Sequence, residues 1–222
     1  DFVSMAQIAG APDGVDRGVY AGGANYKRGA LSIGAVNYYS DDIINIFYTE
    51  AKYDIPLSEQ TKLKLAAQYS MQDSVGDELL TGSDFSTSQY GIKAELAAGN
   101  ALFSTAWNST DNGAELRSPW GSIPSYNSVQ VQDFNRAGED SLMLRAGYSF
   151  KSVPNLSAYA LWVNGSQPDD PMQSAQDEYD FNLQWSVTTG SFKGLSLRAR
   201  YAVVTQDMGG PDLQDFRFII NY

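Results

Sequence analysis

The chain has 222 residues, with 26 acidic and 15 basic side chains, a net charge of −11, and neither cysteine nor histidine. The lack of cysteine excludes disulfides and thiolate metal sites, and the lack of histidine excludes a Ser-His-Asp catalytic triad within these residues. The negative charge argues against binding to nucleic acid. We therefore expect no cofactor, no metal and no catalytic residues.

Period-two alternation of apolar and polar residues predicts about twelve β-strands and almost no helix. The strands are expected near residues 2–9, 17–27, 30–39, 43–55, 61–72, 86–97, 101–109, 141–150, 155–164, 176–187, 195–204 and 214–222. No apolar run approaches the roughly 18 residues of a membrane helix, whereas strands of about 9–11 residues can cross a bilayer when tilted. If this chain crosses a membrane, it does so with strands.

The segment 194–204, GLSLRARYAVV, shows the alternation most clearly. One face of this strand is apolar, and Arg198 and Arg200 stand together on the other, because successive side chains of a strand point to opposite faces. Since the pattern recurs along the chain, it indicates a barrel in lipid with an apolar outside and a polar inside. The residues expected to face lipid include Leu195, Leu197, Tyr201, Phe181, Leu183, Trp185, Phe216 and Phe218.

The connections between the strands alternate in length. The short ones are 27–29, 56–60, 98–100, 151–155 and 188–194, and the long ones are 73–85, 110–140, 165–175 and 205–213. Tight turns on one side and long loops on the other are typical of transmembrane barrels. Because an open strand edge in lipid leaves backbone groups unsatisfied, we expect these strands to need partner strands. A sealed smaller barrel, with Phe2–Ala9 paired to Gln214–Tyr222, would contradict this.

Several segments carry a family resemblance: FVSMAQIAG, YYSDDIINIFYTEAKYDIPL, LKLAAQYSMQ, PWGSIPSYNSVQVQDFNRAGED, SLMLRAGYSF, FKGLSLRARYAVV and FRFIINY. Together they resemble the OprD-type outer-membrane porins, over essentially the whole chain. The resemblance implies an all-β fold, a transmembrane antiparallel barrel of eighteen strands in a monomer about twice this length. Residues 1–222 would form a single barrel domain, the C-terminal portion, without the N-terminal strands and the third loop.

The resemblance also implies site residues. In such porins a basic ladder runs down one wall of the lumen and guides carboxylates, and Arg198, Arg200 and Arg217 match it by position. The loop 110–140 resembles the constricting loop, with Ser128 and Asp133 at the eyelet. Four further residues fall on inward faces and are expected to line the lumen: Arg145, Lys93, Glu178 and Asp180.

The arginines have a second interpretation, which is ordinary cross-strand pairing. A hairpin centred near Ser191 would place Arg200 opposite Asn182 and Arg198 opposite Gln184, with Asp180 and Glu178 further along the same face. Some of the positive charge would then be neutralised. The sequence leaves both interpretations open.

The leading hypothesis is a passive, substrate-selective channel in the outer membrane of a Gram-negative bacterium. It would pass small carboxylate solutes such as amino acids or aromatic acids, in contact with outer-membrane lipid and lipopolysaccharide. The alternatives are a non-specific diffusion porin, an outer-membrane barrel enzyme of the lipase or protease type, and a soluble β-sandwich that binds carbohydrate. The missing histidine disfavours the enzyme, and the alternating loop lengths disfavour the sandwich.

Overall fold

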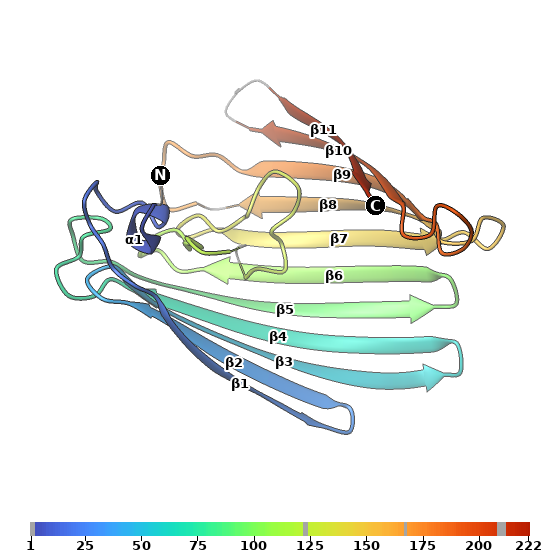
Figure 1. The fold of residues 1–222 in the computed structure, drawn as a ribbon, viewed down its shortest axis with the longest axis horizontal. Helices are drawn as coiled ribbons and strands as arrows, with labels where there is room; N and C mark the ends of the chain where they lie inside the picture. The colour runs from blue at the N-terminus through green and yellow to red at the C-terminus, as the bar shows by residue number, and fades with distance from the viewer. Residues whose placement is uncertain (1–2, 122–123, 167, 208–211) are drawn as a thin grey trace.

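The computed structural model describes residues 3–121, 124–166, 168–207 and 212–222. Its strands form one antiparallel sheet of eleven strands in chain order (Figure 1). The strands are β1 (Tyr20–Arg28), β2 (Leu31–Ser40), β3 (Ile44–Ser58), β4 (Thr61–Asp73), β5 (Ser86–Ala98), β6 (Ala101–Thr110), β7 (Asp140–Ser149), β8 (Leu156–Ser166), β9 (Gln176–Ser186), β10 (Ser196–Gln206) and β11 (Leu213–Asn221). Eleven of the twelve predicted strands are therefore confirmed, with ends shifted by a few residues.

The prediction of a first strand over residues 2–9 is wrong. Met5–Ile8 instead form a short helix, α1, while Asp1 and Phe2 lie outside the described residues. The cause is a capping box, in which the Ser4 side chain accepts from the Gln7 N–H and the Gln7 side chain accepts from the Ser4 N–H, both at 3.2 Å. In the described ranges, no helix has the length and apolar character required to cross a bilayer.

The two faces of the sheet differ as the alternation predicts. We call the inner face the one that carries Arg198 and over which the loop 111–139 and α1 lie (Figure 1). The opposite, outer face exposes large apolar side chains, among them Phe181, Leu183, Trp185, Phe216 and Phe218. Leu197 shares that face, since it pairs with Trp185. Leu195 precedes β10 and lies in the turn.

The sheet is open in the described part of the chain, with β1 and β11 at its two edges. Residues 214–221 pair with β10 through the register Ser196↔Asn221 to Val203↔Gln214. The alternative of a sealed smaller barrel, closed by residues 2–9, is thus not the observed arrangement.

The predicted alternation of connection lengths holds only in the middle of the sheet. Turns as short as Gly29–Ala30 and Gly99–Asn100 lie at one end, whereas the β4–β5 and β6–β7 connections form long loops at the other end. The link 41–43 is short although it lies at the long-loop end, and the β9–β10 connection, predicted to be short, is longer than the β10–β11 connection, predicted to be long.

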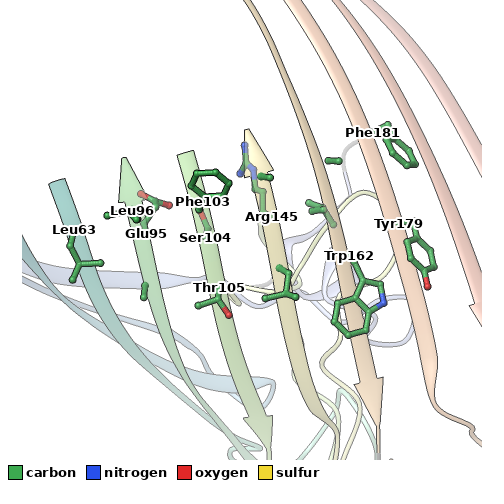
Figure 2. Close-up of a pocket in the computed structure, with 15 residues that line it drawn as sticks. Leu63, Glu95, Leu96, Phe103, Ser104, Thr105, Arg145, Trp162, Tyr179 and Phe181 are labelled. Carbon is green, nitrogen blue, oxygen red and sulfur yellow. The ribbon is translucent and has the colours of Figure 1, made fainter. Parts of the chain in front are cut away.

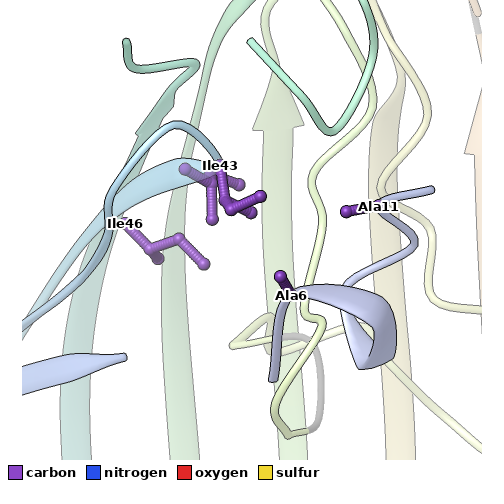
Figure 3. Packing of buried hydrophobic residues seen from close by; sticks show 5 residues of the cluster. Ala6, Ala11, Ile43 and Ile46 are labelled. Atoms are coloured by element: carbon purple, nitrogen blue, oxygen red, sulfur yellow. The ribbon is translucent and has the colours of Figure 1, made fainter. Parts of the chain in front are cut away.

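At the long-loop end, Ala6 and Ala11 of the N-terminal segment pack against Ile43, Ile44 and Ile46 (Figure 3). Trp120 joins this cluster and donates from its indole nitrogen to the Met5 carbonyl at 3.0 Å. The long-loop end therefore has a small apolar core of its own.

Candidate functional site

The strand register brings the predicted arginines together. Arg200 pairs with Asn182 and Arg198 with Gln184 across β9 and β10, as expected for the hairpin. Across the other side of β10, Arg200 lies opposite Arg217 of β11. All three arginines lie on the inner face, because Arg198 and Arg200 are two residues apart on one strand and Arg217 is directly paired with Arg200.

A tyrosine links two of the arginines on different strands. The Arg145 guanidinium of β7 lies 4.0 Å from the centroid of the Tyr159 ring of β8. Arg198 donates from Nη2 to the Tyr159 hydroxyl at 3.5 Å and from Nε to Asn182 Oδ1 at 2.5 Å. We call Arg145, Tyr159, Asn182, Arg198 and Arg200 the arginine cluster.

The arginine cluster has donor capacity left over. Among the described residues, no carboxylate lies within 4 Å of the guanidinium groups of Arg145, Arg198 and Arg200. Guanidinium groups present forked donors that match a carboxylate or phosphate. The cluster can therefore bind an anion without first breaking an ion pair.

Arg217 is more engaged than its neighbours. It forms an ion pair with Asp215, to which its Nε donates at 2.7 Å, and its Nη2 donates to the Gln130 carbonyl at 3.1 Å. The Arg217 guanidinium thus interacts both with Asp215 on its own strand, β11, and with the loop 111–139.

Glu178 and Asp180 lie on the inner face, as predicted, but beneath the loop. Their exposed fractions are 0 % and 1 %. The N–H groups of Val131 and Gln132 donate to the two Glu178 carboxylate oxygens at 2.8 and 2.7 Å, and the Gln130 N–H donates to Asp180 at 3.2 Å. The alternation of the strand correctly predicts that these two carboxylates face inward. Nothing in the sequence pattern predicts that a loop covers them.

Ser128 and Asp133, the predicted eyelet residues, lie next to each other in the loop. The Ser128 hydroxyl donates to Asp133 Oδ1 at 2.6 Å. Both residues border a polar pocket of about 580 Å³, which Arg117 and Asn135 also line. The structure therefore brings this pair together at an open polar surface.

Lys93 of β5 contacts the same loop on the inner face, at the end of the loop segment that lies over β3–β5. Its ammonium group lies 4.8 Å from the Tyr126 ring centroid and 3.7 Å from Glu95. Tyr126 donates its hydroxyl to Glu50 Oε1 at 3.0 Å. Burial, reinforced by the charge of Glu50, raises the pKa of the Tyr126 hydroxyl, which therefore stays protonated and can donate.

An apolar groove of about 620 Å³ lies on the outer face of the sheet. It is lined by side chains such as Leu63, Phe103, Trp162, Tyr179 and Phe181, and it also borders Glu95 and Arg145 (Figure 2). Such a surface suits contact with hydrocarbon rather than chemistry on a polar solute. Within the described ranges, there is also no group of three or more acidic side chains placed to hold a metal ion.

Comparison with known families gives one match over nearly the whole chain. The model of a family described as outer membrane porin, OprD family, matches residues 2–222. Comparison with curated proteins gives no match.

Solved structures show the same fold. OpdQ of Pseudomonas aeruginosa superposes with a TM-score of 0.86 at 19 % identity, covering 96 % of this chain and 58 % of its own. OpdL of the same organism gives 0.85 at 22 % identity, covering 92 % and 58 %. OccAB2 of Acinetobacter baumannii gives 0.81 at 23 % identity, covering 92 % and 54 %. The chain thus spans little more than half the length of these proteins.

Proposed function

The chain belongs to the OprD family of outer membrane porins, and we propose that it forms part of the wall of a channel for small carboxylate-bearing solutes. Transport would be passive, driven by the concentration gradient, with no cofactor and no chemical step. The arginine cluster would provide the path for the carboxylate, with Arg198 and Arg200 as its centre and Arg217 as a partly neutralised end.

One contrast between the two sides of the inner face supports this proposal. On β3–β5, each of four inward lysines lies within 4 Å of a carboxylate: Lys52 of Glu50, Lys62 of Asp54, and Lys64 and Lys93 of Glu95. In the described part of the chain, Arg145, Arg198 and Arg200 form no such pair. The side formed by β7–β10 therefore offers cationic donors that are free to meet a solute.

The mechanism follows from weak binding at several adjacent groups. A carboxylate that approaches Arg198 or Arg200 exchanges part of its water shell for guanidinium N–H donors. Because neighbouring cations offer comparable sites, the solute can move between them and leave, as conduction requires. The charge-paired lysines and carboxylates on the β3–β5 side of the inner face would keep the path hydrated.

We also propose what the outer face contacts and how the two edges of the sheet are paired in the whole protein. Exposed Phe181, Phe216 and Phe218 would contact outer-membrane lipid and lipopolysaccharide. The β1 and β11 edges would pair with further strands of the same protein in a monomeric barrel of eighteen strands, with residues 1–222 in one domain.

The experiment that tests this function compares an acid with a neutral solute. In proteoliposomes containing the full-length protein, the double variant Arg198→Gln/Arg200→Gln should slow the flux of a small organic acid, because Gln keeps hydrogen bonding but removes both charges. The flux of a neutral sugar of similar size should hardly change. Equal loss of both fluxes would favour a non-specific diffusion porin, in which the arginines only shape the pore.

A further inference from the structure

The loop 111–139 is attached to the inner face at several separate places. On the β3 side, Tyr126 reaches Glu50. Over the middle of the sheet, Phe134 is 1 % exposed and packs with Ala106, Met143 and Val163, which belong to β6, β7 and β8. The loop therefore lies across the face rather than projecting from the end of β6 and β7 (Figure 1).

The attachment on the β9 side consists of buried carboxylates and backbone N–H groups. Three consecutive residues of the loop, Gln130, Val131 and Gln132, direct their N–H groups to Asp180 and to both oxygens of Glu178. Backbone N–H groups in a buried loop need acceptors, because an unpaired one has lost its hydrogen bond to water without replacement.

Gln130 is held from β11 as well. Its carbonyl accepts from Arg217 at 3.1 Å and its side-chain amide donates to the Asp215 carbonyl at 3.2 Å. The same short segment is thus bound by β9 and by β11, the two neighbours of β10, through both its donors and its acceptors.

We propose that Glu178 and Asp180 are positioning residues that hold the loop 111–139 across the inner face and so set the width of the channel. They act through the loop, not by direct contact with a solute, since both are buried beneath it. The proposal rests on the proposed function in one respect only, that the inner face lines the channel.

Glu178 allows an isosteric test. A carboxyl group can accept at both oxygens, whereas the Gln amide accepts only at Oε1 and carries donors at the other position. Glu178→Gln therefore loses one of the two hydrogen bonds from Val131 and Gln132. At that position the Gln amide N–H points at a backbone N–H, and the two donors repel each other. The matched control is Glu95→Gln, which makes the same carboxyl-to-amide change on the inner face where the side chain pairs with Lys64 and Lys93.

The measurement is single-channel current of the full-length protein in planar bilayers with potassium chloride as the only solute. Glu178→Gln should raise the mean conductance and add flickering between current levels, because the released loop moves in the path. Glu95→Gln should conduct steadily near the wild-type level. Equal traces for the two variants, whether both changed or both unchanged, would overturn the proposal.

Two further arms keep the test informative. Folding is checked by the heat-dependent shift of the barrel on denaturing gels. If Glu178→Gln does not assemble, Gln132→Pro removes one donor from the loop side and leaves the strands intact, and it should give the same flicker. A steady wild-type conductance for an assembled Gln132→Pro would overturn the proposal. Since only chloride and potassium are present, the result is independent of whether organic acids are selected.

Discussion

Arg200 of β10 and Arg217 of β11 lie directly opposite each other on the inner face. Like charges in opposite positions of neighbouring strands are destabilising. Here the ion pair between Arg217 and Asp215 relieves the repulsion. The two arginines therefore share one wall but present different amounts of free charge.

The first prediction concerns that ion pair. Asp215→Asn should free the Arg217 charge and lower the concentration of organic acid that half-blocks ion current, by roughly twofold for a partly exposed pair. Asp54→Asn is the control, since Asp54 of β3 pairs with Lys62 of β4, away from the arginines. An equal change in both variants would mean that overall charge alone, rather than the freed arginine, controls acid binding.

A second prediction concerns the tyrosine between the arginines. Tyr159→Phe keeps the ring beneath Arg145 and loses only the long contact of its hydroxyl with Arg198, so acid affinity should remain near wild type. Tyr159→Leu also removes the cation–π contact, worth about 0.5–1 kcal/mol, and should weaken acid binding by about two- to fivefold. Titration of ion current with acid distinguishes them. The idea fails if the Phe and Leu variants bind acid equally.

Much of this structure could be predicted because a strand alternates strictly. The alternation in GLSLRARYAVV predicted that Arg198 and Arg200 share one face, and the hairpin between β9 and β10 predicted their pairing with Asn182 and Gln184. The strand predicted over residues 2–9 was wrong because the residues SMAQ form a capping box, whose local hydrogen bonds favour a helix. Parity also placed Glu178 inward, but its partners are backbone N–H groups 46 and 47 residues earlier, and such contacts leave no pattern in the sequence.

The third prediction is a depth-dependent cost on the outer face. Phe181 lies at mid-strand in β9, whereas Leu197 is the second residue of β10. Arginine on the lipid face costs about 2–4 kcal/mol near the midplane and about 0–1 kcal/mol near an interface. Phe181→Arg should therefore destabilise the barrel in urea titrations in lipid vesicles far more than Leu197→Arg. Phe181→Leu serves as the size control, and equal costs for the two arginine variants would reject the assigned depths.

The fourth prediction concerns pH at the long-loop end. Asp42 accepts from Arg17 Nε and Nη2 at 3.0 and 2.7 Å and from the Asp77 N–H at 3.0 Å. The Arg17 guanidinium, helped by that N–H, holds the pKa of the Asp42 carboxyl below its usual range. A lowered pKa means that this contact stabilises the folded state above the ordinary carboxyl pKa of about 4 and is lost as the pH falls below it.

The protection of residues 3–19 against hydrogen exchange, measured relative to the intrinsic exchange rate at each pH, should thus be steady from neutral pH to about pH 5 and fall below about pH 4. Asp42→Asn should raise the exchange at neutral pH. Asn suits this position because φ is +58° there, a region that Asn tolerates. Asp41→Asn is the neighbouring control, and exchange in Asp42→Asn equal to that control would contradict the assignment.

The last prediction separates local from overall charge in the proposed carboxylate path. Arg198→Gln/Arg200→Gln and Lys62→Gln/Lys64→Gln each remove two inward positive charges, but the lysines pair with Asp54 and Glu95. Both variants should shift the reversal potential in a salt gradient toward cation selectivity, because each leaves the lumen more negative. Only the arginine variant should lose affinity for an organic acid, since forked donors without an ion-pair partner are removed only there. If the lysine variant lost acid affinity to the same extent, the field of the whole lumen would draw in the solute, and the arginine cluster would have no special role.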